Sequence, residues 1–311
     1  MRILTVGAGA VGGYVGGRLA QAGRDVEFLV RPGRAARLRD EGLRIVGAAG
    51  TDVVDARPVT AADLAGPYDL VLVGVKAQSL QAAIEDFRPA VGARTAVVPF
   101  LNGINHIDVL VAVFGRPAVL GGVLRIVTQL DADGAIRELA PGGSIQIGEL
   151  DATASERADS IAECLAVPGF DVSVPANIVD AMWSKWVFIA TIGAVTSLAH
   201  GSIGEVVATP GGAAFAENTL AEAASVVKAA GHELGDAAFE AVRKSVTTPG
   251  APTTSSLSRD LVAGQPTEVD AVIGDLIDLA HASQLPVARL EAAALVLRAH
   301  DARLARARTG R

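Results

Sequence analysis

Short apolar runs alternate with segments of helical period in the first third of the chain. The apolar runs predict strands at residues 2–6, 25–30, 69–75 and 95–98. Between them, apolar residues recur with the helical spacing, which predicts helices at residues 10–22, 77–87 and 104–114. The run at residues 69–75 is almost continuously apolar, as in a parallel strand that is covered on both faces. This alternation predicts a Rossmann-like, doubly wound parallel sheet.

The rhythm changes near Val119. Apolar runs joined by glycine-containing turns at residues 131–134 and 141–143 predict strands at residues 119–129, 135–139 and 144–147. We interpret these strands as an antiparallel addition to the same sheet. A helix at residues 153–166 and a last strand at residues 171–174 complete this part of the chain.

Beyond Pro175 the pattern is almost entirely helical, apart from a non-helical stretch at residues 247–256. The helical period predicts helices at residues 178–198, 211–230, 236–245, 267–283 and 286–305. We therefore predict an α/β protein with two domains, a Rossmann-like domain at residues 1–174 and an all-helical domain at residues 175–311.

The composition is compatible with this division and excludes several classes of protein. A chain of 311 residues, 50% of them hydrophobic, is long enough for about two domains with a core in each. The net charge of −7 argues against nucleic acid or an anionic membrane surface as the main partner. Cys164 is the only cysteine, so no intrachain disulfide is expected. The five histidines have no metal-ligand spacing, and we expect no metal site.

No segment has the pattern of a targeting signal or a membrane span. The apolar run before the first glycine is too short for a signal peptide. The most apolar later stretch, residues 186–199, is shorter than the ~20 residues that span a bilayer, and Lys185 stands at its head. We expect this stretch to be a buried helix in a soluble, cytoplasmic protein.

A glycine-rich turn carries the clearest functional signal. The first predicted strand is followed by a GxGxxG sequence that opens a helix, formed by Gly7, Ala8, Gly9, Ala10, Val11 and Gly12. In a dinucleotide site Gly7 permits the tight turn, Gly9 lets the backbone approach the pyrophosphate, and Gly12 lets helix and strand pack closely. The alternative is an ordinary glycine-rich turn, but the strand before it and the helix after it favour a cofactor site.

Arg31 follows the second strand, about twenty residues after the last glycine of the motif. An acidic residue at this point binds the ribose 2′-hydroxyl of NAD, whereas an arginine suits the 2′-phosphate of NADP. Arg34 is a second candidate for the same role. The alternative is that both arginines are solvated surface residues.

Two polar residues follow later strands, at the edge of a parallel sheet where ligands bind. Lys76 comes after the strand at residues 69–75, and Asn102 comes after the strand at residues 95–98. Lys76 could also be an exposed lysine at a strand end, and Asn102 with Gly103 could form a plain turn. Their shared edge with the glycine turn favours the functional interpretation.

Lys185 begins the most apolar helix, so it either reaches solvent or lies partly desolvated in a site. Desolvation would lower its pKa and make it a proton donor near neutral pH, which the reduction of a carbonyl needs. Glu268 begins a later helix, where an acid also complements the helix dipole. Thr267 and Asp270 next to it are spaced like a capping box.

Together these residues resemble the ketopantoate reductase (2-dehydropantoate 2-reductase) family, over nearly the whole chain. The resemblance includes the glycine turn, Arg31, Lys76, Asn102, Lys185 in its tryptophan-flanked segment, and the stretch from Ser255 and Ser256 to Glu268 and Asp270. It implies NADP(H) as cofactor, a Rossmann domain, a helical domain for substrate binding and dimerisation, an active site in the cleft between them, and a homodimer in many members.

The resemblance also implies roles for single residues. Lys185 would be the general acid and contact the substrate carbonyl, and Glu268 would lie at the cofactor–substrate junction and orient Lys185. Ser256 would bind the substrate carboxylate. Lys76 and Asn102 would position the nicotinamide ribose and the substrate.

The family pattern has substrate-binding asparagines at two positions where this chain has Ile189 and Gly193. Burying a substrate hydroxyl against Ile189 would cost about 1–3 kcal/mol, although Thr196 lies further along the same helix face. We therefore predict NADPH-dependent reduction of a 2-keto acid, which is ketopantoate or a bulkier or less polar relative. The alternatives are an NADP-dependent dehydrogenase acting on a 3-hydroxy acid or an imine, and a non-catalytic NADPH sensor.

Overall fold

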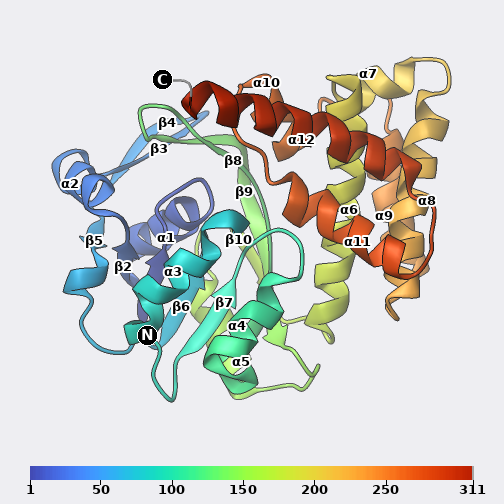
Figure 1. The fold of residues 1–311 in the computed structure, drawn as a ribbon. Helices are drawn as coiled ribbons and strands as arrows, with labels where there is room; N and C mark the ends of the chain where they lie inside the picture. The colour runs from blue at the N-terminus through green and yellow to red at the C-terminus, as the bar shows by residue number, and fades with distance from the viewer. Residues whose placement is uncertain (310–311) are drawn as a thin grey trace. The chain divides into compact units, whose positions relative to one another are not determined.

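The structure is a computed structural model that describes residues 1–309, so the last two residues of the predicted helical domain lie outside the described residues. The chain forms two compact units (Figure 1). Unit 1 comprises Met1–Leu101 and His106–Ala181, and unit 2 comprises Asn102–Asn105 and Met182–Arg311. The division falls inside a helix, after Ala181. The domain boundary near Pro175 stays a prediction.

Unit 1 contains a five-stranded sheet, here called sheet A, whose neighbouring strands are all parallel. Its strands, in spatial order, are β5 (Arg57–Val59), β2 (Asp25–Leu29), β1 (Arg2–Val6), β6 (Leu70–Val73) and β7 (Ala96–Pro99). The order reverses direction at β1, so the crevice for a ligand lies at the carboxyl end of that strand. The predicted doubly wound sheet is confirmed.

Alternate residues of the strands face opposite sides of sheet A, and each side has its own core. Ile3 faces the cluster that contains helix α1 (Gly12–Gln21), whereas Leu4 faces the cluster that contains α3 (Leu80–Phe87) and α4 (His106–Phe114). Because both faces are covered, the strands are apolar throughout, which explains the run at residues 69–75.

The hairpin after Val119 belongs to a second sheet, here called sheet B, and the expectation that it extends sheet A is wrong. Sheet B contains β10 (Phe170–Ser173), β9 (Ile136–Glu149), β3 (Leu43–Gly47) and β4 (Gly50–Val54), with β8 (Leu120–Leu130) antiparallel to β9. Sheet B and α1 share one hydrophobic core with sheet A. The hairpin therefore packs on the core of sheet A as part of sheet B, and a single parallel bridge between Val97 and Val119 connects its start to the edge strand β7.

The turn expected at residues 141–143 is also wrong, because β9 runs through it without interruption. Gly142 has φ +69°, and the pairing of β8 with β9 shifts register opposite this point. The glycines form a bulge that bends the strand while its pairing continues on both sides. Unit 1 also contains α2 (Pro32–Glu41) and α5 (Glu156–Leu165), and short 3₁₀ turns at Ala61–Asp63, Ala77–Ser79, Arg88–Ala90 and Arg116–Ala118.

In the described part of unit 2, every regular element is helical. The helices are α6 (Ile178–Ala199, from Met182 onward in this unit), α7 (Ile203–Ala208), α8 (Gly212–Ala229), α9 (Asp236–Thr247), α10 (Ser256–Val262), α11 (Asp275–Ala282) and α12 (Ala288–Thr309). Helix α8 contacts α7, α9, α11 and α12 (Figure 1). The helix predicted at residues 267–283 begins instead as a π-helical turn, η5 (Asp270–Gly274), which continues into α11. The all-helical character of this region is confirmed.

Helix α6 contains the apolar stretch singled out in the sequence. By length and composition it could cross a bilayer, and 61% of its most apolar segment is buried inside the protein. The core helix of a globular protein has the same length and composition, so these properties alone do not make α6 a membrane span. The apolar stretch predicted at residues 186–199 is the part of α6 that follows Lys185.

Candidate functional site

The glycine turn between β1 and α1 is built on close backbone contacts. Gly7 has φ +91°, which favours glycine. A Cβ atom on Gly12 would lie 2.2 Å from the carbonyl oxygen of Gly7, and one on Gly74 would lie 2.6 Å from the backbone of Gly12. A Cβ atom on Gly9, in contrast, would meet nothing within 4 Å. At Gly7 and Gly12 the turn therefore has no room for a side chain, because other atoms of the protein lie close by. Beside Gly9 the space is open, and a dinucleotide would approach the backbone there.

Arg31 and Lys76 lie at the same edge of sheet A as the glycine turn. Arg31 follows β2 and is the exposed N-cap residue of α2, and Lys76 follows β6 and is also exposed. Because β2, β1 and β6 are adjacent parallel strands, their carboxyl ends lie together. These residues therefore surround the turn on two sides, as a cofactor site at the switch point requires.

Arg34 lies deeper than Arg31. Its Nη2 atom donates hydrogen bonds to the carbonyl oxygens of Ala8, at 3.2 Å, and of Gly134, at 3.0 Å. Burial and the nearby Arg37 lower the pKa of Arg34 from its usual value. Arg34 thus contributes positive charge directly beside the glycine turn.

In unit 2, the segment Asn102–Asn105 is attached to the start of η5 and α11. The side-chain nitrogen Nδ2 of Asn102 donates a hydrogen bond to Glu268 Oε2 at 3.4 Å. A Cβ atom on Gly103, which has φ +76°, would lie only 2.4 Å from the carbonyl oxygen of Ala271, so the two backbones are in close contact. A hydrogen bond also joins Asn105 to Asp275. Two of the predicted site residues, Asn102 and Glu268, are therefore brought together.

Lys185 lies in α6, next to a residue that ties this helix to η5. The indole nitrogen of Trp186, which is 1% exposed, donates a hydrogen bond to the carbonyl oxygen of Val272 at 2.8 Å. The ring of Trp183 stacks on His232, with the ring centroids 4.5 Å apart. Lys185 therefore lies between two tryptophans whose side chains have fixed partners. One of them, Trp186, joins α6 to η5, the element that follows Glu268.

Thr267 does not form a capping box with Asp270, contrary to the pattern in the sequence. Both its backbone nitrogen and its hydroxyl donate to the carboxylate of Asp301 in α12, at 3.0 and 2.7 Å. Asp270 instead forms an ion pair with Arg298 at 2.8 Å. The segment that carries Glu268 is therefore held by α12 through contacts that no local spacing could predict.

The remaining predicted substrate residues lie where α10 packs on α6. The hydroxyl of buried Thr196 donates to the carbonyl of Ile192 at 2.7 Å and is 2.8 Å from the hydroxyl of Ser255. Ser255 also caps α10 by accepting a hydrogen bond from the backbone of Ser258. Thr196 therefore has partners within the protein, and Ser256, at the first turn of α10, is exposed.

Apolar side chains lie over Gly193. A Cβ atom there would be 3.0 Å from Leu257 Cδ1 and 3.9 Å from Ile273 Cδ1. Ile189, one turn earlier on α6, is half-buried. This face of the helix thus combines small and apolar groups at the positions where the family pattern has asparagines.

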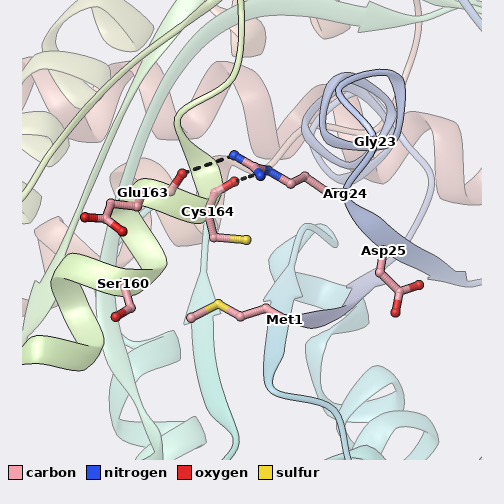
Figure 2. A pocket seen from close by; sticks show the side chains of 7 residues that line it. All are labelled: Met1, Gly23, Arg24, Asp25, Ser160, Glu163 and Cys164. Carbon is pink, nitrogen blue, oxygen red and sulfur yellow. Dashed lines mark hydrogen bonds between the residues drawn. The ribbon is translucent and has the colours of Figure 1, made fainter.

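A hollow of about 540 Å³ in unit 1 has no relation to these residues (Figure 2). It is lined by Met1, Gly23, Arg24, Asp25, Ser160, Glu163 and Cys164. Arg24 donates to the carbonyl oxygens of Cys164 and Glu163, at 3.0 and 3.3 Å, at the end of α5. The hollow lies at the amino ends of β1 and β2, opposite the glycine turn, and we assign no ligand to it.

Sequence reasoning missed several residues that shape the site. Asn105 is joined to Asp275 by one hydrogen bond, and Asp301 accepts two from Thr267, so both connect segments more than thirty residues apart. Thr128 of β8 contacts the glycine turn from the second sheet, donating to the carbonyl of Ala10 at 2.8 Å. No sequence signal marks Thr128, because its partner depends on how the hairpin packs.

Comparison with known proteins supports the family that the site residues resemble. The family described as ketopantoate reductase PanE/ApbA matches residues 3–152, and its C-terminal domain matches residues 177–301. The uncharacterized oxidoreductase YkpB of Bacillus subtilis is 33% identical over 97% of this chain and 99% of its own length. A 2-dehydropantoate 2-reductase of Halobacterium salinarum is 31% identical over 93% of this chain and 96% of its own.

Solved structures share the fold over nearly the whole chain. A PanE/ApbA family ketopantoate reductase from Ralstonia eutropha has a TM-score of 0.85 at 25% identity, covering 98% of this chain and 99% of that one. A D-mandelate dehydrogenase with bound NADH and anilino(oxo)acetate has a TM-score of 0.87 at 19% identity, covering 98% and 99%, which shows a shared fold. The chain is an oxidoreductase and belongs to the ketopantoate reductase family.

Proposed function

We propose that the protein reduces a 2-keto acid to a 2-hydroxy acid with NADPH, and that Lys185 is the general acid. The observation that carries this proposal is the hydrogen bond between Asn102 and Glu268, at 3.4 Å. It joins the residue that follows the last strand of the dinucleotide fold to the acid expected at the cofactor–substrate junction. Family membership supports a nicotinamide cofactor and a small keto-acid substrate.

The glycine turn and its surroundings fit a dinucleotide. The open space beside Gly9 and the N-terminus of α1 suit a pyrophosphate, because free N–H groups and the helix dipole favour anions there. Arg31 at the end of β2 suits a 2′-phosphate, and the half-buried Arg34 adds positive charge beside it. These arginines favour NADPH over NADH as the cofactor.

A nicotinamide cofactor held by the glycine turn would supply the hydride that reduces the substrate carbonyl. The carbonyl oxygen then requires a proton, and we assign its delivery to the ammonium group of Lys185. The lysine becomes neutral and recovers its proton from water. Glu268 and Asn102, bonded to each other, would position the reacting groups. A positioned acid of this kind contributes a factor of ~100 to 10,000 to the rate.

The α6 face favours a substrate that is less polar than ketopantoate. Ile189 offers no hydrogen bond, and Leu257 and Ile273 lie over Gly193. A substrate hydroxyl buried against these groups would lose its hydration without a partner, at a cost of about 1–3 kcal/mol. We therefore expect a 2-keto acid with an aliphatic or aromatic substituent to be reduced at least as well as ketopantoate.

An NADPH-oxidation assay with a panel of 2-keto acids tests the proposal. Ketopantoate, bulkier aliphatic 2-keto acids and an aromatic one are compared in the wild type and in Lys185→Ala. We expect kcat to fall at least ~100-fold in this variant while NADPH binding persists. Lys244→Ala, which removes an exposed lysine of α9, is the matched control. Unchanged turnover in Lys185→Ala would exclude Lys185 as the general acid.

The same panel separates the remaining alternatives. Tight NADPH binding without oxidation of any keto acid would indicate a sensor, and activity on an imine or a 3-hydroxy acid alone would indicate another dehydrogenase. Equal use of NADH and NADPH would show that Arg31 does not read the 2′-phosphate.

A further inference from the structure

Two carbonyl oxygens of the glycine turn are held by side chains from other elements of unit 1. The hydroxyl of Thr128 in β8 donates to the carbonyl oxygen of Ala10 at 2.8 Å. Arg34 in α2 donates to the carbonyl oxygen of Ala8 at 3.2 Å. Both acceptors lie between the motif glycines, in the part of the turn that precedes α1.

The β8–β9 hairpin is connected to both of these contacts. Thr128 belongs to β8, and Arg34 also donates to the carbonyl oxygen of Gly134 in the turn between the two strands, at 3.0 Å. Further along β9, Glu138 accepts a hydrogen bond from Tyr14 at 2.9 Å and forms an ion pair with Arg18 at 2.6 Å, and both partners lie on α1. The hairpin thus supports the turn and the helix that follows it.

We propose that Thr128 is a positioning residue for the dinucleotide, which it does not touch. A trans peptide is planar, and its carbonyl and the following N–H point in opposite directions. Holding the oxygen of Ala10 therefore aims the N–H of Val11 away from Thr128. Backbone N–H groups at this end of the helix are the phosphate donors of a dinucleotide turn. This inference rests on the proposed dinucleotide site.

The regular alternation of β8 gives Thr128 its direction. Leu124 belongs to the core cluster that includes α1 and Ile126 packs against it, and Thr128 lies on the same face, two residues further along the strand. The register between β8 and β9 shifts between Ile126 and Val127 and again between Val127 and Thr128, and the extra residues lie on β9. The alternation of β8 therefore continues to the contact of Thr128 with the glycine turn.

Thr128→Val and Thr128→Ser test the role of the hydroxyl. Valine keeps the shape of threonine but donates no hydrogen bond, and serine keeps the hydroxyl. We expect the Kd of NADPH to rise about three- to ten-fold in Thr128→Val, the effect of one net hydrogen bond, and to return close to the wild-type value in Thr128→Ser. At saturating NADPH, kcat should stay within twofold.

Two further readouts separate positioning from other causes. Since the turn is common to both cofactors, Thr128→Val should weaken NADH and NADPH by the same factor, whereas a residue that reads the 2′-phosphate would change NADPH alone. Thr60→Val removes a hydroxyl bonded to Asp63 in the same unit and is the control, with no expected effect on Kd. Thermal unfolding of each variant verifies that it is folded.

The proposal is overturned if Thr128→Val binds NADPH as the wild type does, or if valine and serine weaken binding equally. Absence of dinucleotide binding in the wild type would instead reject the proposed cofactor site itself. The failure of the positioning role and the failure of the proposed function therefore have different outcomes.

Discussion

Gly12 in α1 belongs to the proposed cofactor turn and Gly193 in α6 to the proposed substrate-binding face, and the surroundings of these two glycines differ in kind. At Gly12 in α1, an added Cβ would lie 2.2 Å from the backbone oxygen of Gly7. At Gly193 in α6, it would lie 3.0 Å from the end of the Leu257 side chain. A backbone atom cannot move without changing the turn, whereas a leucine methyl group can rotate away. The glycine turn is thus defined by its backbone and the α6 face by exchangeable side chains.

This difference explains how a protein of this fold can keep its cofactor chemistry while its substrate changes. Side chains on α6 can be replaced at moderate cost in stability, so the groups that face a substrate can vary. The glycine turn allows no such replacement at Gly12, where an added Cβ would meet the backbone of Gly7 and disturb the N–H groups that would face a phosphate. The following predictions test whether the two regions really differ in this respect.

Gly12→Ala should have the largest effect. Alanine favours a helix over glycine by roughly 0.5–1 kcal/mol, but the clash with Gly7 outweighs this gain. We expect the free energy of unfolding to fall by about 3 kcal/mol and dinucleotide binding to be lost. Urea unfolding and a fluorescence titration with NADPH measure the two quantities. An unfolding midpoint equal to that of the wild type would show that the turn can relax, which would remove the contrast with Gly193.

The helices α6, α10 and α11 with η5 are here called the side-chain region. Trp186→Phe tests whether this region also depends on one fixed contact, the hydrogen bond between Trp186 and Val272. Phenylalanine leaves the carbonyl of Val272 without the indole N–H and leaves a small cavity, so we expect a loss of about 2 kcal/mol in unfolding free energy. Because α6 is then held less firmly to η5, kcat should also fall several-fold. Trp183→Phe, which retains an aromatic ring beside His232, is the control. Equal effects of both substitutions would argue that ring volume alone matters.

Gly9→Ala separates folding from binding within the glycine turn. Its Cβ would enter open space, so the unfolding free energy should change by less than about 0.5 kcal/mol. The same methyl group would occupy the space through which a pyrophosphate approaches the backbone, and we expect NADPH affinity to fall at least ~10-fold, or ~1.4 kcal/mol. Unaltered affinity would place the pyrophosphate elsewhere.

The glycine turn could be predicted from the sequence, whereas the side-chain contacts of the site could not. The motif from Gly7 to Gly12 is contiguous, and its function depends on backbone geometry that the residue types themselves dictate, so both the turn and the parallel sheet around it could be predicted. The pairing of Asn102 with Glu268 joins residues 166 positions apart. Only the resemblance to a family indicated that they belong together.

The errors in the predicted fold come from segments whose pattern depends on a distant partner. The strand β4 is mostly exposed and has no apolar alternation, so only its pairing with β3 identifies it. Residues 141–143 resemble a turn but remain paired within β9. The boundary near Pro175, the homodimer and the cytoplasmic location stay predictions, because they depend on contacts or context beyond the chain's own pattern.

Gly193→Ala is the counterpart of Gly12→Ala and should have a small effect of the opposite sign. Leu257 can yield by a few tenths of an ångström, and alanine favours the helix, so we expect a gain of up to about 0.5 kcal/mol in unfolding free energy. NADPH binding should be unchanged, and only the KM of the keto acid should respond. If the unfolding free energy instead falls by more than ~1 kcal/mol, Leu257 of α10 cannot move away from α6, and this contact is as rigid as that between Gly12 and Gly7.

Asp275→Asn should produce the smallest effect, and it concerns the side-chain region alone. Burial, and then the neighbouring Asp278 and Asp270, raise the pKa of Asp275 above its usual value of 3.8, although the hydrogen bond from Asn105 opposes this shift. Since the folded state then holds the proton more tightly than the unfolded state, wild-type stability declines as the pH rises from 3.8 through the raised pKa. Asparagine carries no charge, so this decline should be absent.

At pH 7, relief of the repulsion with Asp278 should make Asp275→Asn more stable by roughly 0.2–0.5 kcal/mol, whereas near pH 3 the two proteins should be equally stable. Urea unfolding of both proteins between pH 3 and pH 7 measures the difference. If Asp275→Asn is instead less stable at pH 7, the bond between Asn105 and the charged carboxylate outweighs the repulsion. The segment Asn102–Asn105 would then be fixed to α11 by charge, and the side-chain region would be less adjustable than its contacts around Gly193 indicate.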